Sequence, residues 1–264
     1  MKRKKMMRIT VLNDNQADGP FFSEPGLSYL VESGKTFLFD TGPSDVICRN
    51  AALLNINLNL IKTIVVSHGH YDHANGLEHL NGQELICHPD VFNKHFRKNG
   101  GSFNGMSLSR EEAEAKFNII CTKEPYYLSE NVAFLGEIPR VNDFEARTTG
   151  FQDEAGNDDF IPDDSGVAIK TENGLVILSG CAHSGICNMV SHAINCMNEK
   201  KVFAVIGGFH LKELNDQVRR TIGFLRSLNV EKIIPAHCTE VPALDAFNKV
   251  WPFDRVRSGQ VMDI

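Results

Sequence analysis

The sequence has no uninterrupted apolar run of about 18 residues, the shortest length that is read as a membrane-spanning helix. It also lacks an excess of basic residues, because 27 Lys and Arg stand against 33 Asp and Glu and the formal net charge is −6. Phosphate binding concentrates Lys and Arg on one face, so this mild acidity argues against a nucleic-acid partner. The only basic cluster, Lys2–Lys5, is interpreted as a solvated terminus. We therefore expect neither a membrane nor a nucleic acid as partner.

Two further absences concern the cysteines and the N-terminus. The seven cysteines include no CxxC pair and no compact array, which argues against a structural zinc ribbon, and their odd number disfavours a disulfide framework. The basic N-terminus is followed by the polar segment ITVLNDNQADG before an apolar stretch of the signal-peptide type has formed. These features predict a cytoplasmic protein with free thiols.

The composition that is present is typical of a globular α/β protein. The 264 residues are 42% apolar, which is enough for one sizeable core or for two tightly joined halves. In each half a hairpin comes first and β-α-β units follow, which predicts a mixed sheet covered by helices. We expect a single domain, residues 1–264, of two similar halves at about 1–140 and 165–264.

Local patterns place the expected elements of both halves. Apolar alternation and β-branched runs predict strands at 8–12, 27–33, 35–40, 60–66, 84–88, 117–125, 131–139, 166–170, 174–180, 201–207 and 231–236. Capping and helical spacing predict helices after Ser44, from Pro89, after Ser109, and at 186–198, 213–228 and 242–251. Asn173-Gly174 is a strong signal for a two-residue hairpin turn. Ser109 and Glu112 form a capping box.

An acidic insertion at about 143–164 interrupts this rhythm, with eight acidic residues against one Arg. We interpret it as a long mobile loop or lid, and a solvated insertion is the alternative. It could cover the site described below, line a dimer contact or do neither.

The segment Ser67–His73 carries the clearest chemistry in the sequence. His68, His70, Asp72 and His73 place three imidazoles and one carboxylate within six residues, directly after a buried strand. Neutral imidazole is a preferred ligand of zinc, iron and manganese, and a carboxylate suits a second ion. Burial of four polar side chains in one short loop costs free energy unless a metal or hydrogen bonds satisfy them. This segment therefore predicts a metal site.

The HxHxDH arrangement of this segment is the defining motif of the metallo-β-lactamase superfamily, which the chain resembles over nearly its full length. The resemblance includes FLFDTG, in which Asp40 stands where family members place a carboxylate that hydrogen-bonds the metal-binding loop. It extends to PAHCT, in which His237 follows a strand as the last family histidine does. The resemblance implies a four-layer αββα sandwich of two mixed sheets flanked by helices, with a metal centre where the sheets meet.

The resemblance also implies a set of metal ligands. His68 and His70 would bind the first ion, and the second would be bound by Asp72, His73 and His237. We expect one or two divalent ions, zinc first, with iron or manganese as alternatives.

In the middle of the chain the sequence differs from the family pattern. The stretch FLGEIPRVNDFE has no histidine where most members have one. His183 could supply the missing imidazole, or it could act in a supporting or substrate role. Cys181 stands at a strand end where the family has Asp or, in some members, Cys, so it is either a ligand or a small residue beside the site. Asp163 and Asp164 are further candidates for the vacated position.

Two more residues are candidates for work on the substrate. In Gly207-Gly208-Phe209-His210-Leu211 a strand again ends in a turn, and His210 would contact substrate or transfer a proton. Arg140, in GEIPR, offers a bidentate handle for a phosphate or carboxylate. The remaining histidines are interpreted as structural or solvated; they are His79, His88, His95 and His192.

Secondary motifs resemble one branch of the superfamily. GEIPR, GLVILSGCAHSGI, GGFHL and PAHCT are similar to those of 7,8-dihydropterin-6-methyl-4-(β-D-ribofuranosyl)aminobenzene 5′-phosphate synthases. The branch usually reads HCTG, whereas this chain has Glu240 at the last position, so the turn there is expected to differ.

The expected activity is that of a metal-dependent hydrolase of an anionic small molecule, for example a phosphorylated one. A metal ion lowers the pKa of bound water towards neutrality, so hydroxide forms at physiological pH, and Asp72 can bind metal and orient that water. The alternative enzyme is a transferase that joins a pterin to an aminobenzene ribosyl phosphate. A third possibility is a non-hydrolytic metal-dependent sensor or redox protein. The sequence leaves the oligomeric state open.

Overall fold

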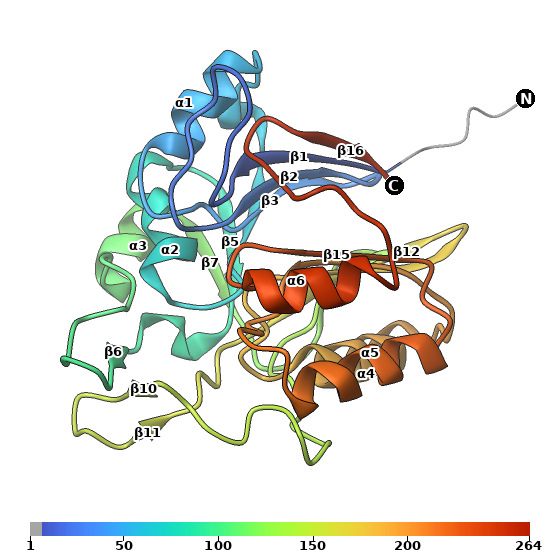
Figure 1. Ribbon diagram of the computed structural model, residues 1–264. Coiled ribbons are helices and arrows are strands. Elements are labelled where there is room, and N and C mark those ends of the chain that lie inside the picture. The colour runs from blue at the N-terminus through green and yellow to red at the C-terminus, as the bar shows by residue number, and fades with distance from the viewer. Residues whose placement is uncertain (1–6) are drawn as a thin grey trace, which may run out of the picture.

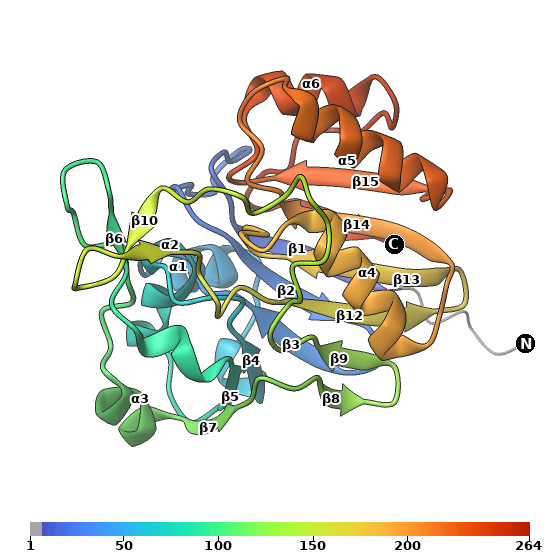
Figure 2. The ribbon, with the colours of Figure 1, turned by 90° about the horizontal axis from the view of Figure 1, so that it is seen from below.

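The protein is described by a computed structural model over residues 7–264, so the basic cluster at residues 2–5 lies outside the described range. Two mixed β-sheets pack face to face, and helices cover the outer face of each sheet (Figures 1 and 2). This is the αββα sandwich that the family resemblance implied. Within residues 7–264, no helix combines the length and the apolar character that crossing a membrane requires.

The first sheet has seven strands. In chain order, the first three strands pair antiparallel with their neighbours, and the next three continue the sheet in parallel pairing from the third strand. In spatial order the strands are β16 (Val261–Asp263), β1 (Arg8–Asn13), β2 (Ser28–Glu32), β3 (Thr36–Phe39), β4 (Thr63–Val65), β5 (Glu84–Cys87) and β7 (Asn118–Cys121).

The second sheet repeats this plan with six strands. Antiparallel pairs come first, and β13, β14 and β15 are then parallel. In spatial order the strands are β15 (Lys232–Ala236), β14 (Val202–Gly208), β13 (Gly174–Ser179), β12 (Gly166–Thr171), β9 (Val132–Phe134) and β8 (Tyr126–Ser129). The pairing of Thr171 with Gly174 confirms the predicted two-residue hairpin turn.

The helices divide between the two sheets (Figure 1). The first sheet is flanked by α1 (Val46–Leu53), α2 (Tyr71–Ala74), α3 (Arg110–Lys116) and the 3₁₀ turns η1 (Leu58–Leu60), η2 (Asn75–His79) and η3 (Pro89–Phe92). The second sheet is covered by α4 (Ile186–Met197), α5 (Asp216–Ser227) and α6 (Val241–Asn248).

Alternation along the strands divides the core into three layers. Phe37 and Phe39 point between the sheets, whereas Leu38 points towards the helices of the first sheet. In the second sheet Val176 faces the inter-sheet layer and Ile177 faces α4 to α6. Because successive side chains of a strand point to opposite faces, a sheet with apolar residues at every position must be covered on both sides. The continuous apolar runs of the sequence therefore produce four layers.

Several predicted helices are shorter in the structure. The helix expected from Pro89 is only the 3₁₀ turn η3, in which His88 Nδ1 accepts a hydrogen bond from Asp90 N at 3.1 Å. The helix expected after Ser44 begins at Val46, whose N–H donates a hydrogen bond to Ser44 Oγ at 3.3 Å. The helix expected over 213–228 begins at Asp216, because Asn215 accepts from Val218 N and caps it. The capping box of Ser109 and Glu112 is confirmed.

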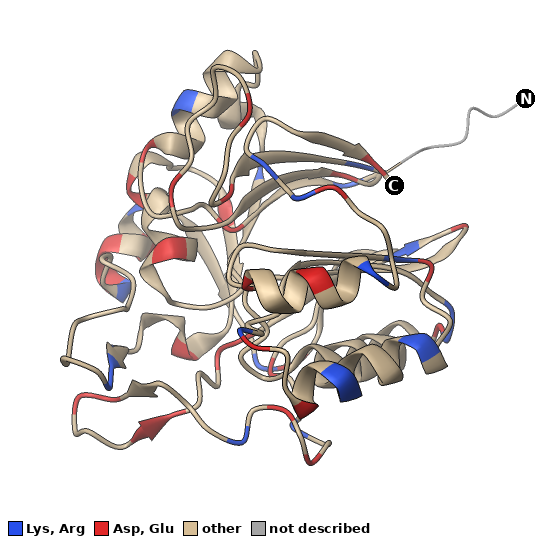
Figure 3. Ribbon diagram, viewed as in Figure 1, with Lys and Arg blue, Asp and Glu red and all other residues tan. Residues whose placement is uncertain are grey.

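The acidic insertion is ordered by a small third sheet. Its central strand β10 (Phe151–Gln152) pairs with β11 (Asp158–Asp159) on one side and with β6 (Phe96–Arg97) on the other. Figure 3 shows acidic residues along this segment, which lies to one side of the two main sheets. Phe151 is nevertheless 8% exposed, because its side chain turns inward. The insertion is thus tied to the first half of the chain through β6.

Asp14, directly after β1, is a buried carboxyl group with incomplete hydrogen bonding. Its side chain is 3% exposed, and Oδ1 accepts a hydrogen bond from Asn15 N at 2.8 Å. Its Oδ2 has no hydrogen-bond partner among residues 7–264. Burial raises the pKa of Asp14 from 3.8 to about 7.

We expect this group to make the folded protein less stable as the pH rises from about 4 to about 7. In that range the folded state keeps a proton on Asp14 that the unfolded state has released, so the free energy of unfolding falls with rising pH. One pKa unit corresponds to about 1.4 kcal/mol, so Asp14 accounts for about 4 kcal/mol of this fall. Urea denaturation of the wild type and of Asp14→Asn across this range should show a shallower fall in the variant. Equal pH profiles would contradict the assignment.

Candidate metal centre

The candidate site lies where strand ends of the two sheets meet. Asp40 follows β3, and the segment Ser67–His73 follows β4; on the second sheet Cys181 lies beyond β13, His210 beyond β14 and His237 directly after β15. These strands are parallel within each sheet, so their carboxyl ends share one edge. The fold thereby brings together residues from five distant parts of the chain.

Backbone strain gathers at the same edge. Asp40, Ala182, His210 and His237 have positive φ angles of 56°, 54°, 49° and 49°. Left-handed backbone at residues other than glycine is uncommon and persists only where the surrounding structure enforces it. Such strain clusters at functional sites, because it aims side chains in directions that relaxed backbone does not allow.

Three histidines form the first group of candidate ligands. One ring nitrogen from each of His68, His70 and His183 lies within 4.8 Å of the others. His68 Nε2 is 3.1 Å from His70 Nδ1. The Nε2 atoms of His70 and His183 are buried and have no hydrogen-bond partner among residues 7–264. The structure thus places His183 beside the first two histidines, where the sequence lacked a third imidazole.

The second group combines a carboxylate with two imidazoles. Asp72, His73 and His237 each bring one ligand atom within 4.8 Å of the others. His73 Nε2 lies 3.1 Å from His237 Nε2, and Asp72 Oδ2 lies 3.5 Å from His237 Nε2. Cys181 Sγ is 3.2 Å from His73 Nε2 and also forms a group with His68 and His73. Cys181 therefore lies between the two groups of histidines.

A second thiol, Cys238, belongs to the site and was left open by the sequence. Together with Cys181 and His237 it forms a further group of potential ligands. Its Sγ lies 3.8 Å from Cys181 O and accepts a hydrogen bond from His210 N at 3.3 Å. Its place directly after His237 was the only available signal, and adjacency in sequence does not show where a thiol points.

Burial keeps most of these imidazoles neutral. It lowers the pKa of His68, His70, His183 and His237 well below the ordinary value of 6.5, and the neighbouring histidines lower it further. A neutral imidazole has a free lone pair and is the form that binds metal. The site therefore offers ligand nitrogens without first having to lose protons from these four rings.

His73 differs because it is paired with Asp40. Burial alone would lower the pKa of His73, but the charge and hydrogen bond of Asp40 outweigh it and raise the pKa to about 9. Asp40 Oδ2 lies 2.7 Å from His73 Nδ1, which leaves His73 Nε2 facing the site. Asp40 also accepts hydrogen bonds from Ser67 N and Ser67 Oγ, each at 2.7 Å. One buried carboxylate thus orients both ends of the histidine-rich loop, as the family resemblance implied.

Asn15 orients the last histidine, and the sequence contained no sign of it. Its Oδ1 lies 2.9 Å from His237 Nδ1, and its Nδ2 donates to His237 O at 3.1 Å. Because the amide oxygen accepts from Nδ1, it fixes the tautomer that leaves His237 Nε2 free. The two residues are 222 positions apart, so only the fold brings them into contact.

Asp163 and Asp164 contact the ligand-bearing loops rather than the groups of ligands. Asp163 Oδ2 accepts a hydrogen bond from Gly69 N at 2.6 Å, and Asp164 Oδ2 accepts from Ser184 N at 2.9 Å. Gly69 is required at its position, because a Cβ there would lie 2.0 Å from Val91 O. Neither carboxylate is in a ligand group among the described residues.

His95 links the acidic insertion to the histidine-rich loop. Its Nδ1 is 2.5 Å from Asp159 Oδ2 in β11, its Nε2 is 3.8 Å from Asp163 Oδ1, and its ring centroid is 5.3 Å from that of His70. Burial alone would lower the pKa of His95, but the hydrogen bond with Asp159 and nearby carboxylates raise it. Of the two sequence-based interpretations of His95, structural or solvated, the structure supports the structural one. Its contacts hold the acidic insertion next to the histidine-rich loop.

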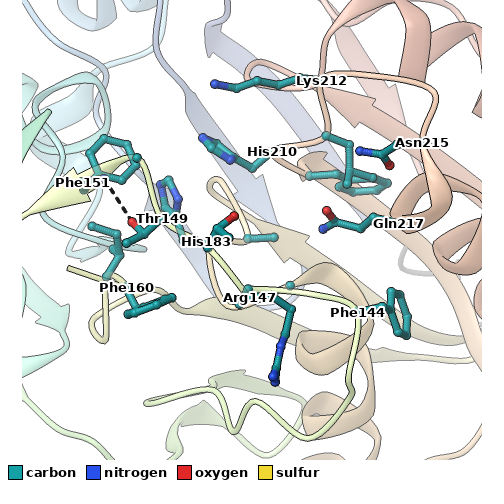
Figure 4. A pocket seen from close by; sticks show the side chains of 18 of the residues that line it. Phe144, Arg147, Thr149, Phe151, Phe160, His183, His210, Lys212, Asn215 and Gln217 are labelled. Atoms are coloured by element: carbon teal, nitrogen blue, oxygen red, sulfur yellow. Dashed lines mark hydrogen bonds between the residues drawn. The ribbon is translucent and has the colours of Figure 1, made fainter. Parts of the chain in front are cut away.

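A cavity of about 350 Å³ opens beside the first group of histidines (Figure 4). His183 and His210 lie in its wall with ring centroids 4.5 Å apart, and Phe151 from the acidic insertion packs against His183 at 5.3 Å. Arg147 and Lys212 also line it. The insertion therefore forms one wall of the cavity.

His210 and Arg140 differ in their access to this cavity. Burial lowers the pKa of His210 to about 4, and the nearby charge of Lys212 contributes, so the ring is neutral at pH 7. Arg140 does not line the cavity. Its Nη2 donates to Phe160 O and Ile161 O in the acidic insertion, so it supports the cavity wall from outside.

The donor atoms at this edge fit divalent metal ions. Two pairs of ring nitrogens lie 3.1 Å apart, and two buried Nε2 atoms have no partner among residues 7–264. Imidazole, thiolate and carboxylate together are the ligand set of zinc and related transition metals. The arrangement is thus suited to metal binding and to chemistry on a ligand held in the adjoining cavity.

The chain is similar to known proteins in sequence and in fold. Residues 23–84 match the family model of the metallo-β-lactamase superfamily. The chain is similar to the 7,8-dihydropterin-6-methyl-4-(β-D-ribofuranosyl)-aminobenzene-5′-phosphate synthase of Methanocaldococcus jannaschii, with 35% identity covering 97% of this chain and 96% of that protein. It is 30% identical to an uncharacterised protein of the same organism, over 97% of this chain and all of that protein. A crystal structure of a metal-dependent hydrolase of the β-lactamase superfamily is 30% identical, with a TM-score of 0.87 over 98% of this chain and 99% of that one.

Proposed function

Because the chain belongs to the metallo-β-lactamase superfamily, we propose that it is a metal-dependent hydrolase of an anionic, in particular phosphorylated, small molecule. The observation that carries the proposal is the pair of ligand groups where strand ends of the two sheets meet, directly beside a cavity with cationic residues in its wall. A structural zinc site is closed by its ligands, whereas a catalytic site keeps access for substrate.

We propose that His68, His70 and His183 hold one ion and that the second group of ligands holds another. The second group consists of Asp72, His73 and His237, with Cys181 between the two groups. Zinc is the first choice, with iron and manganese as alternatives. A bound divalent ion lowers the pKa of water and polarises a phosphoryl or carbonyl oxygen.

In this proposal other residues of the chain orient water, transfer a proton and bind the substrate. Asp72 can accept a hydrogen bond and orient a water molecule, since its carboxylate is partly exposed next to His237. Neutral His210, in the cavity wall, can donate a hydrogen bond to substrate or relay a proton. Arg147 and Lys212 can attract an anionic group, and Phe151 and Phe160 can contact an apolar or aromatic part of the same molecule.

The alternative is a pterin-transferring synthase, and the 35% identical relative that carries such a name favours it. The same cavity would then hold an aryl acceptor, and the anion-binding residues would hold the leaving pyrophosphate. Incubation of metal-loaded protein with a dihydropterin diphosphate and an aminobenzene ribosyl phosphate separates the two functions. Coupled product supports the synthase, whereas release of pterin or phosphate without coupling supports the hydrolase.

Metal content tests the basis of both functions. Mass spectrometry of protein purified without chelator or affinity tag should find close to two ions per chain. About one ion would mean that only one group of ligands binds metal. Iron with a visible absorption band and no turnover of phosphoesters would favour the third possibility, a sensor or redox protein.

We expect Cys181 to be identifiable as a ligand by cobalt substitution. A thiolate bound to Co²⁺ gives a charge-transfer band in the near ultraviolet, and Cys181→Ser should remove most of it. Cys187→Ser is the matched control, because Cys187 is equally buried but lies in α4 and is in no ligand group among residues 7–264. A full band in Cys181→Ser would exclude Cys181 and point to Cys238 as the thiol ligand.

A further inference from the structure

Two thiols face each other at the outer edge of the first sheet. Cys87 ends β5 and Cys121 ends β7, and the two residues are direct partners in the parallel pairing of these strands. Their Sγ atoms lie 3.7 Å apart, and both cysteines are free thiols. Neither belongs to a group of potential metal ligands among the described residues.

The two thiols have different environments. Cys87 is fully buried, whereas Cys121 is partly exposed because β7 is the last strand of the sheet. Arg110 Nη1 lies 3.7 Å from Cys121 Sγ. The guanidinium is held in place because Arg110 Nη2 donates to Pro89 O at 3.1 Å and Arg110 Cζ lies over the Phe92 ring, 4.7 Å from its centroid.

This arrangement favours a thiolate at Cys121. The hydrogen bond from the Cys87 thiol and the adjacent guanidinium lower the pKa of Cys121, although partial burial opposes them. The same hydrogen bond, together with burial, raises the pKa of Cys87. The thiolate is the reactive form of cysteine, and its partial exposure allows small reagents to reach it.

The spacing also allows a bond between the two sulfur atoms. A disulfide needs Cα atoms about 4.4–6.8 Å apart, a range that neighbouring strands at about 4.8 Å satisfy. A shift of each side chain by about 0.8 Å would bring the sulfurs from contact to bonding distance. The backbone on both sides is held by sheet pairing and needs no rearrangement.

We propose that Cys87 and Cys121 form a redox-reactive dithiol that a peroxide converts to a disulfide. The thiolate of Cys121 attacks one oxygen of hydrogen peroxide, the O–O bond breaks, and the products are a sulfenic acid and hydroxide. The hydroxide becomes water by taking up the proton that the Cys121 thiol released when it ionised. The Cys87 sulfur then attacks the sulfenic sulfur and its proton leaves with the hydroxyl group as water. Overall two thiols and one peroxide give one disulfide and two waters.

Peptide mapping of the metal-loaded full-length protein tests this proposal. Each thiol lies in a tryptic peptide with no other cysteine, residues 63–94 for Cys87 and 117–123 for Cys121. After treatment with one equivalent of hydrogen peroxide, we expect these two peptides to be joined, with a mass lower by two hydrogen atoms. Absence of this joined species at full consumption of peroxide would overturn the proposal.

Variants separate the roles of the two sulfurs. In Cys87→Ser, oxidation by peroxide should stop at the sulfenic acid of Cys121, which a cyclic diketone traps on peptide 117–123. In Cys121→Ser, peroxide should leave Cys87 unmodified. Cys48 and Cys196 are internal controls, because they are also partly exposed but burial raises their pKa. Alkylation of Cys121 at pH 7 should be at least tenfold faster than alkylation of either control. Equal rates, or trapping of sulfenic acid at the controls instead, would contradict the proposal.

Discussion

Replacement of His68 and His70 together by alanine is expected to remove metal from the first group of ligands and to abolish activity. Two of the three imidazoles in that group are lost, and His183 alone cannot hold an ion. Loss of the charge stabilisation that a metal provides, about 4 kcal/mol, corresponds to at least about a 10³-fold fall in turnover. Metal content per chain and turnover of the substrate identified for the wild type are the measurements.

The sheets should stay folded in this double variant. Both histidines lie on the loop after β4 at the sheet edge, and the three apolar layers do not include them. Circular dichroism and the cooperativity of urea denaturation check the fold. His79→Ala is the matched control, because this exposed histidine follows closely in η2 and is in no ligand group of the described residues. Full metal content in the double variant would defeat the assignment of these ligands.

Asp40→Asn is expected to weaken metal binding by about 10–100-fold at the second group of ligands, although Asp40 is not a proposed ligand. The carboxylate accepts three hydrogen bonds, from Ser67 N, Ser67 Oγ and the Nδ1 side of His73. An amide has only one oxygen. If that oxygen serves Ser67 N, the NH₂ group faces His73 and forces Nδ1 to accept, which puts the proton on Nε2. A protonated Nε2 cannot bind metal.

Asparagine is the informative substitution, because it tolerates the left-handed backbone that Asp40 adopts at φ 56°. Asp40→Ala also removes all three hydrogen bonds from the buried loop and should reduce the free energy of unfolding by about 3–5 kcal/mol. Calorimetric titration with zinc and urea denaturation distinguish these effects. Asp45→Asn serves as the control, since Asp45 is exposed and its side chain makes no capping hydrogen bond. Unchanged zinc affinity in Asp40→Asn would contradict the orienting role of this carboxylate.

Much of the fold followed from local patterns in the sequence. The β-branched run at 60–66 predicted a strand buried on both faces, which is β4, and the predicted two-residue hairpin turn joins β12 to β13 through Glu172 and Asn173. The errors lie in short elements. Pro89 starts only a 3₁₀ turn, and the acidic insertion pairs as β10 and β11 rather than remaining a loop. Strands of two residues have too little local sequence to be recognised, since their stability comes from pairing, of β10 with β6 and of β11 with β10.

The candidate site was only partly visible in the sequence. His68, His70, Asp72 and His73 fall within six residues, so their spacing alone indicated a metal site. The position of His183 beside them, and the contact of Asn15 with His237, required the folded chain.

The sequence by itself determined a mixed sheet covered by helices and the types of ligand, because both are properties of neighbouring residues. Apolar alternation and β-branched runs mark the strands, and HxHxDH concentrates metal-binding groups. Only the tertiary structure decided which distant side chains complete the site. Strand ends of two sheets bring Cys181 and His237 to the histidine-rich loop after β4, and sheet pairing sets Cys87 against Cys121. Contacts between residues far apart in the chain depend on how sheets and layers pack, and no local pattern encodes them.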